Sequence, residues 1–196
     1  VLHAEARDFL FRQRRIHPAV VQWMGISSIS VATPCWRHGK PYYDAPSLLF
    51  PYRDQNGRLM NVQSRYLGRE ADIPRFRFPS RSECRIYGLP VVRRLETGEG
   101  LWLSEGVTDC LALLSSGRKA IAIPGATLLK PEDVKLLASL KTEKRTVFHI
   151  FPDRDEAGER LYRQLLTAIN SIGACLIRDE LPDGCKDFGQ WWAAQA

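Results

Sequence analysis

Short apolar runs alternate with helical patterns in the second half of the chain. The runs read "LWLS", "AIAIP", "TVFHIF" and "ACLI". Between the last two, every fourth residue from Ala157 to Ile169 is apolar, which predicts an amphipathic helix over about 157–171 with one stripe against a sheet. Strands that alternate with helices in this way predict a mostly parallel α/β sheet.

The first half of the chain has a different pattern. Residues 4–15 and the stretch "HPAVVQWMG" predict two short helices, the second with Pro18 in its first turn and Gly25 at its end. Two strand-like runs then flank Asn56-Gly57, a dipeptide favoured in tight hairpin turns. In the second of these strands an apolar face alternates with a polar face, which carries Asn61, Gln63 and Arg65.

The charge is distributed unevenly between the two halves. The net charge is +6, but residues 1–95 carry 16 basic and 7 acidic side chains, whereas residues 96–196 carry 12 and 15. In the first half every basic residue except Lys40 is arginine, the side chain suited to forked contacts with phosphate. A soluble basic surface would account for this composition, and so would a nucleic-acid channel beside an acidic metal site.

The bulk composition excludes several classes of protein. With 196 residues, of which 44% are hydrophobic, the chain can bury the core of one large or two small domains. No stretch approaches the roughly 20 apolar residues of a membrane span, and no secretory signal opens the sequence. The five cysteines form no CxxC pair, which argues against a zinc ribbon and a disulfide framework. We therefore expect a cytoplasmic protein with no zinc and no membrane contact.

Acidic residues follow three of the four apolar runs. Glu105 comes directly after the first run with Asp109 four residues on, Asp153 and Asp155 follow the third, and Asp187 lies beyond the fourth. The carboxyl ends of parallel strands meet at one edge of a sheet, where ligands bind. Each carboxylate alone could simply cap a helix, but together they offer the hard oxygen ligands that Mg²⁺ or Mn²⁺ prefers. We expect Glu105 and Asp109 to share one face of the following helix.

These motifs resemble a known family. "EGVTD", "FPDRDEAG" and "KDF" are similar to the three signatures of the Toprim domain, the metal-binding α/β module of primases, topoisomerases and some nucleases. The hairpin, "PRFRFPS" and "IYGLP" resemble the region that precedes Toprim in DnaG-type primases, so the similarity runs from about residue 5 to about residue 192. The resemblance implies a Toprim domain at 97–196, a parallel sheet flanked by helices, preceded by a smaller basic α+β subdomain at 1–96.

The resemblance also implies roles for individual residues. The catalytic acids would be Glu105 and Asp109. The metal ligands would be Glu105, Asp153, Asp155 and Asp187, holding two Mg²⁺ or Mn²⁺ ions. Turns close to the site would depend on Gly106 and Gly125. Nucleotide and nucleic acid would be bound by Arg53, Arg58, Arg65, Arg75, Arg77, Arg81 and Arg85.

Two positions depart from the family pattern. The family often carries a lysine shortly before "YGL", where this chain has Arg81 and Arg85. In the third signature the family primases usually show two aspartates, whereas this chain has Lys186 followed by Asp187. The zinc-binding template module of the family has no counterpart in these residues.

The function implied by the resemblance is that of a DNA primase catalytic core. Such an enzyme makes short RNA primers from ribonucleoside triphosphates on a single-stranded DNA template, by metal-dependent nucleotidyl transfer, and can work beside a replicative helicase. Two alternatives stay open at this point. One is a non-catalytic module that binds single-stranded DNA or a replication partner and keeps a vestigial Toprim. The other is a Toprim nuclease or a topoisomerase fragment.

Overall fold

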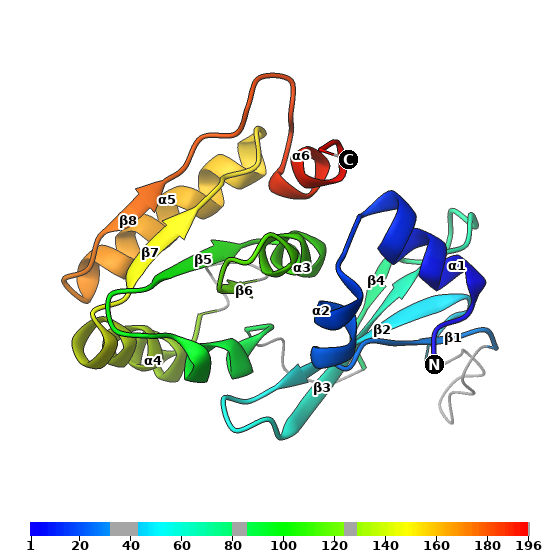
Figure 1. Cartoon of the computed structure of the whole chain (residues 1–196), viewed down its shortest axis with the longest axis horizontal. Helices are drawn as coiled ribbons and strands as arrows, with labels where there is room; N and C mark the ends of the chain where they lie inside the picture. The colour runs from blue at the N-terminus through cyan, green and yellow to red at the C-terminus, as the bar shows by residue number, and fades with distance from the viewer. Residues whose placement is uncertain (32–42, 80–85, 124–128, 196) are drawn as a thin grey trace.

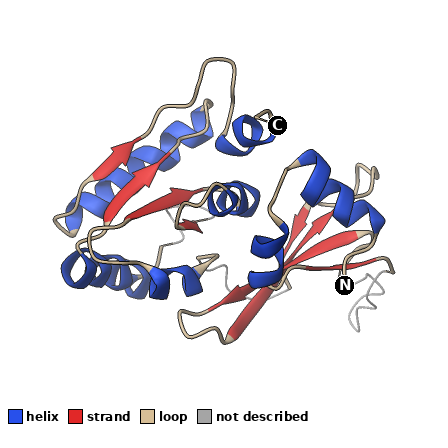
Figure 2. Cartoon of the chain, in the orientation of Figure 1, coloured by secondary structure: helices blue, strands red, loops and turns tan. Residues whose placement is uncertain are grey.

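The described residues form two four-stranded sheets, one in each half of the chain (Figure 1). The computed structural model describes residues 1–31, 43–79, 86–123 and 129–195. Helices and strands are distributed over both halves, and Figure 2 separates them by colour. Within the described ranges no helix is long and apolar enough to cross a membrane.

The first sheet is antiparallel, with strand order β1-β2-β3-β4. Its strands are β1 (Ser27–Ile29), β2 (Ser47–Arg53), β3 (Leu59–Tyr66) and β4 (Phe76–Arg77). The helices before it are α1 (Ala4–Arg7), the π-helix η1 (Asp8–Gln13) and α2 (Pro18–Trp23). The helix predicted over residues 4–15 is therefore an α-helix in its first turn and a π-helix from Asp8 to Gln13. The second predicted helix is confirmed, and Gly25 follows it with a φ of +69°.

The hairpin predicted around Asn56-Gly57 is confirmed, with Gly57 at a φ of +86°. The burial of β3 differs from what its apolar and polar faces suggest. Arg65, on the polar face, is only 7% exposed, whereas Met60, on the apolar face, is 52% exposed. On this polar face Gln63 finds a partner, since it accepts a hydrogen bond from the Tyr52 hydroxyl at 3.2 Å.

The second sheet is parallel, as predicted, with strand order β6-β5-β7-β8. Its strands are β5 (Gly100–Ser104), β6 (Ala120–Ala122), β7 (Val147–Ile150) and β8 (Leu176–Arg178). Its helices are α3 (Val107–Ser115), α4 (Pro131–Lys144), α5 (Glu156–Ser171) and α6 (Phe188–Ala193). Right-handed crossovers place α3 on one face and α4 and α5 on the other, and Figure 1 shows α3 on the side nearer the first half.

The helix predicted over 157–171 is α5, and its apolar stripe faces the sheet. Leu161, Leu165 and Ile169 are buried, whereas Ala157 at the head of the predicted stripe is exposed. The next residue, Gly158, is buried instead. Its backbone lies so close to the preceding turn that a Cβ on it would be 2.3 Å from the backbone oxygen of Asp153. The first turn of α5 is thus packed against the turn that carries the paired aspartates.

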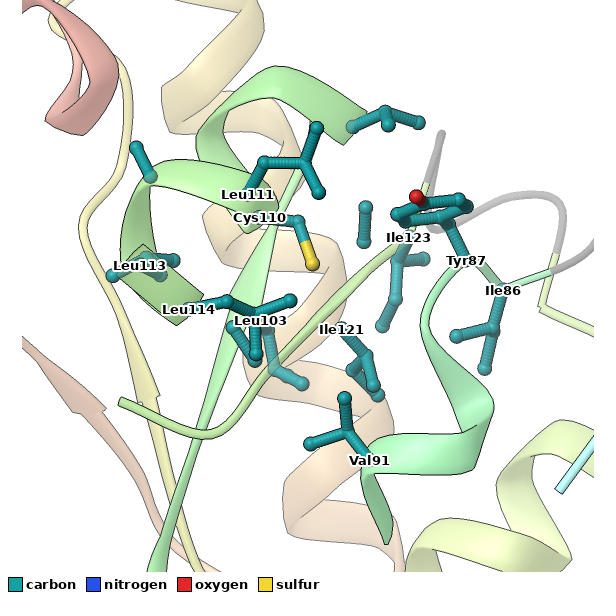
Figure 3. Packing of buried hydrophobic residues seen from close by; sticks show 14 of the residues in the cluster. Ile86, Tyr87, Val91, Leu103, Cys110, Leu111, Leu113, Leu114, Ile121 and Ile123 are labelled. Atoms are coloured by element: carbon teal, nitrogen blue, oxygen red, sulfur yellow. The ribbon is translucent and has the colours of Figure 1, made fainter. Parts of the chain in front are cut away.

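The "IYGL" segment joins the two sheets. Tyr87 exchanges two backbone hydrogen bonds with Ala122 of β6, of 2.9 and 3.0 Å. Its ring packs edge-on against Phe50 and Tyr52 of β2, with centroids 6.3 and 5.1 Å away. Figure 3 shows Tyr87 among the buried residues packed around α3 and β6. The 3-10 helix η2 (Leu89–Arg94) follows this segment. One apolar core therefore runs through both halves. The division at residue 96 stays a prediction.

Candidate metal and nucleic-acid site

The five acidic residues singled out in the sequence act on one another electrostatically. Burial, followed in order of effect by the charges of Asp109, Asp187, Glu105 and Asp155, raises the pKa of Asp153 to about 7. Charges act this strongly only at short range, so the five side chains lie close together. They follow β5, β7 and β8, at the carboxyl-terminal edge of the parallel sheet. We call these five residues the acidic cluster.

Asp109 is the most enclosed member of the acidic cluster. It lies in the first turn of α3, and its Oδ1 accepts a hydrogen bond from the Gly189 backbone N–H at 3.1 Å. A Cβ at Gly189 would lie 2.5 Å from Oδ1, and one at Gly106 would lie 2.7 Å from Oδ2. Two glycines therefore let the backbone close around this carboxylate. Burial, and next the charge of Asp187, raise its pKa to about 6.

Glu105 differs from the expectation that it shares a helix face with Asp109. Helix α3 begins at Val107, and Gly106 is its N-cap, so Glu105 lies in the turn before the helix. Its side chain is exposed, whereas that of Asp109 is partly buried. The i, i+4 spacing was misleading because Glu105 lies outside the helix. Glu105 is thus an exposed carboxylate at the mouth of the acidic cluster.

Asp155 and Asp187 each cap a helix. The Gly158 N–H donates to Asp155 Oδ1 at 2.9 Å at the start of α5, and the Gln190 N–H donates to Asp187 Oδ1 at 2.6 Å at the start of α6. Asp155 also pairs with Lys186, whose Nζ lies 3.0 Å from Oδ2. The Gly158 hydrogen bond and then the lysine lower the pKa of Asp155. The capping alternative is therefore correct for these two residues, which nevertheless still act on Asp153.

The acidic cluster fits a divalent ion shared with a phosphate. Within residues 1–31, 43–79, 86–123 and 129–195, no group of three or more acidic, histidine or cysteine side chains is arranged to hold a metal by itself. Mg²⁺, however, typically takes one or two protein carboxylates and completes its shell with phosphates and waters. Asp153 meets this need, because it is partly buried among four other carboxylates and accepts no hydrogen bond from a described residue.

A basic cavity of about 930 Å³ lies on the first half of the molecule, between the N-terminal helix and the end of β3. We call it the arginine pocket, since its lining includes Arg7, Arg12, Arg65, Arg69 and Arg75. The guanidinium of Arg65 lies 3.9 Å from the centroid of the Phe9 ring and 5.5 Å from that of Phe76. Aromatic faces thus hold this cation.

Arg65 lacks an anionic partner among the described residues. Its Nε is buried and makes no hydrogen bond there. Burial, followed by the charges of Arg14 and Arg75, lowers its pKa to about 10. The side chain stays protonated near neutral pH, so only an anion can offset its charge. The arginine pocket is therefore suited to a phosphate group.

Of the other predicted arginines, the three that the structure describes, Arg53, Arg58 and Arg77, do not line this pocket. Arg77 forms an ion pair of 3.0 Å with Asp44, and Arg53 donates to the Gly57 carbonyl at 2.9 Å. Arg58 is exposed beside the hairpin turn, roughly 20 Å along β3 from Arg65 at the usual rise of a strand. The predictions for Arg81, Arg85 and Gly125 concern positions outside the described residues.

Arg14 and Phe9 were missed by the sequence analysis. Arg14 lies 5.5 Å from the Phe9 ring centroid, and its charge lowers the pKa of both Asp109 and Arg65. It is thus within electrostatic reach of both sites, so the acidic cluster and the arginine pocket are neighbours. The π-helix η1 carries Phe9, and π-helices often mark functional sites. The sequence offered only a weak sign, the basic run around residues 12–15.

Comparisons with known proteins show which folds the chain resembles. Residues 102–191 match the family model described as Toprim-like. The RNA polymerase domain of Mycobacterium tuberculosis DnaG, solved with double-stranded DNA, matches at 20% identity and a TM-score of 0.75, over 98% of this chain and 70% of that one. The primase of Aquifex aeolicus matches at 19% identity and 0.77, over 96% and 52% of the two chains.

A structure described as the DnaG catalytic core matches at 24% identity and a TM-score of 0.68, over 95% of this chain and 67% of that one. The chain thus spans about two thirds of the length of several primase cores that it matches. None of the curated proteins compared with this sequence matches it. Residues 102–191 are thus similar to the Toprim-like family, and the chain has the fold of the solved DnaG-type primase catalytic cores.

Proposed function

We propose that this chain is a DNA primase catalytic core, a nucleotidyltransferase that joins ribonucleotides into short RNA primers on single-stranded DNA. One observation carries the proposal: on the fold of a primase core, the acidic cluster and the arginine pocket are neighbours, with Arg14 acting on both. A site for a divalent ion beside a site for phosphate is what nucleotidyl transfer requires.

The arginine pocket would bind the triphosphate of the incoming nucleotide. Arg65 offers a buried guanidinium with no anionic partner among the described residues, fixed against Phe9, and Arg75 adds an exposed positive charge beside it. Fixing the triphosphate here would hold its reacting end toward the acidic cluster, on the side of Arg14. The protein's contribution to this step is positioning and charge complementarity.

The acidic cluster would hold Mg²⁺ or Mn²⁺ through Asp153, with Asp109 or Glu105 as a second ligand. The bound metal would supply Lewis-acid activation of the primer hydroxyl and charge neutralisation for the departing pyrophosphate. Glu105, which is exposed, would receive the proton that the hydroxyl loses. Asp109, enclosed by Gly106 and Gly189, would orient the site rather than contact substrate.

The template would follow the exposed arginines at the rim of the arginine pocket, such as Arg69 and Arg75. Two structural neighbours support a nucleic-acid partner, since one is a DnaG catalytic domain bound to single-stranded DNA and another was solved with double-stranded DNA. A replicative helicase is a further proposed partner. It rests on the neighbour described as the primase fragment of the bacteriophage T7 primase-helicase protein.

Primer synthesis on single-stranded DNA, with all four ribonucleotides and Mg²⁺ or Mn²⁺, tests this function. We expect the chain to make short RNA products and Asp153→Asn to reduce them by at least about a hundredfold, the usual order for an essential acid or metal ligand. Glu143→Gln, an exposed acid on α4 away from the cluster, is the matched control and should leave the products unchanged.

The same assay separates the alternatives. Salt-sensitive DNA binding without any RNA product, unaffected by Asp153→Asn, would show a non-catalytic binding module and contradict the proposal. Shortened template DNA that disappears with Asp153→Asn would show a Toprim nuclease.

A further inference from the structure

The loop that carries Asp187 is bonded directly to the turn that carries the paired aspartates. The backbone N–H of Arg154, between Asp153 and Asp155, donates to the carbonyl oxygen of Lys186 at 2.8 Å. The guanidinium of Arg154 in addition donates to the carbonyl oxygen of Leu181, at the start of the same loop. The position of the Lys186 backbone beside Asp155 is therefore fixed by main-chain geometry and does not depend on the side-chain ion pair.

The Lys186 side chain uses that position to neutralise Asp155. Its Nζ lies 3.0 Å from Asp155 Oδ2, while the Lys186 N–H is itself held at 2.6 Å by Gln190 Oε1. An exposed ion pair alone contributes little to stability, because ordering two side chains costs entropy. Here the main-chain hydrogen bond already holds the two residues side by side, which lowers that cost.

The acidic cluster is thereby divided into two electrostatic environments. Both carboxylate oxygens of Asp155 have partners, since Oδ1 accepts the Gly158 N–H at the start of α5 and Oδ2 lies 3.0 Å from Lys186 Nζ. The Asp153 side chain, two residues before it, has no hydrogen bond or ion pair with a described residue. A divalent ion approaching Asp153 meets uncompensated negative charge. One approaching Asp155 meets an ammonium group already seated on the carboxylate, and the two cations would repel each other at close range.

We infer that Lys186 is a built-in replacement for one of the two metal ions, so that the acidic cluster binds a single divalent ion, on the side of Asp153. The inference rests on the proposed metal-dependent function and specifies the number and place of its ions.

Counting bound Mn²⁺ tests the inference without reference to activity. The free ion is measured by electron paramagnetic resonance while Mn²⁺ is titrated into the full chain, and isothermal calorimetry gives an independent stoichiometry. We expect one ion per chain for the wild type and two for Lys186→Met, which keeps the aliphatic stem and removes the charge. Lys135→Met, an exposed lysine on α4, is the control and should bind one ion. Circular dichroism establishes that each variant is folded.

A double variant then locates the additional ion. Lys186→Met with Asp155→Asn should return to one ion per chain, because the carboxylate uncovered by the first change is removed by the second. Two ions in the wild type, no ion in the wild type, or one ion in folded Lys186→Met would overturn the inference.

Primer synthesis measured on the same samples keeps the two proposals apart. RNA primers from a wild type that binds two ions would refute the role of Lys186 and leave the primase function standing. One ion in the wild type and two in Lys186→Met, without primers, would support Lys186 and refute the primase function.

Discussion

The acidic cluster and the arginine pocket both crowd like charges into partly buried positions, but they offset the repulsion by different means. In the acidic cluster, backbone N–H groups and Lys186 neutralise Asp155, which leaves Asp153 uncompensated. In the arginine pocket, the faces of Phe9 and Phe76 hold Arg65 without neutralising it.

The difference determines what each region can accept. The raised pKa of Asp153 lies near neutrality, so this carboxylate can be offset by a proton or by a metal ion. The pKa of Arg65 is lowered only to about 10, so its charge persists and requires an anion. The first region therefore responds to pH and metal, and the second to phosphate.

Arg65→Met should produce the largest change in the arginine pocket. Removing a hydrogen-bonding cation from a phosphate contact should weaken triphosphate binding about 10- to 100-fold. The ligand-free protein should become more stable, since a buried charge without a partner among the described residues is replaced by an apolar chain of similar length. Equilibrium binding of a fluorescent ribonucleoside triphosphate and thermal unfolding measure both effects. An unchanged Kd would place the triphosphate elsewhere.

The acidic cluster should make the metal-free protein less stable as pH rises from about 4 to about 7. The folded-state pKa values of Asp153 and Asp109 are raised to about 7 and about 6, so in this window the folded state binds more protons than the unfolded state. For the partly exposed Asp153 we expect a loss of about 1–2 kcal/mol after allowing for solvent screening. Urea unfolding with a chelator, between pH 4.5 and 8, measures it.

Asp153→Asn should flatten this pH dependence, and Mg²⁺ should restore stability to the wild type at pH 8 but not to the variant. A wild-type stability that increased between pH 5 and 7 would show that the carboxylates are compensated within the protein. The contrast between the two regions would then disappear.

Phe9→Leu tests whether the aromatic face matters to Arg65. Cation–π contacts contribute about 0.5–2 kcal/mol, so triphosphate affinity should fall about 2- to 30-fold while kcat at saturating nucleotide changes little. Phe9→Tyr keeps the ring and should restore the wild-type KM. Equal KM values for the leucine and tyrosine variants would mean that packing alone positions the arginine.

Arg75→Gln should give the smallest effect, one visible in the salt dependence of template binding. Loss of one phosphate contact should reduce the slope of log K against log salt for single-stranded DNA by about 0.7. Arg58→Gln, at the far end of β3, should leave the slope unchanged. Fluorescence anisotropy over a salt series measures both slopes, and an equal reduction for Arg58 would extend the template path to the hairpin turn.

Features governed by local periodicity were predictable from the sequence. The four apolar runs became the four strands of the parallel sheet, and Asn56-Gly57 became the hairpin turn. The gathering of the acidic residues was also predictable, because residues that directly follow parallel strands must meet at one edge of the sheet.

Features that depend on partners distant in the sequence were not predictable. Arg77 was expected in a nucleic-acid groove, but its partner Asp44 lies 33 positions earlier in the chain. Arg65 packs against the ring of Phe9, which lies on the π-helix η1. No periodicity in the sequence predicts a π-helix. Charge counts therefore identified the basic half of the chain but not which arginine would be buried.

The strand-like pairing of Tyr87 with Ala122 has a consequence for how the chain could be divided. Residues 86–95 belong by sequence to the first half, yet they supply backbone hydrogen bonds and apolar cover to β6. A recombinant fragment or domain exchange that begins at residue 97 would leave the outer edge of β6 bare and prone to self-association. The transferable unit of this protein is therefore expected to begin near Ile86, about ten residues before the change in charge.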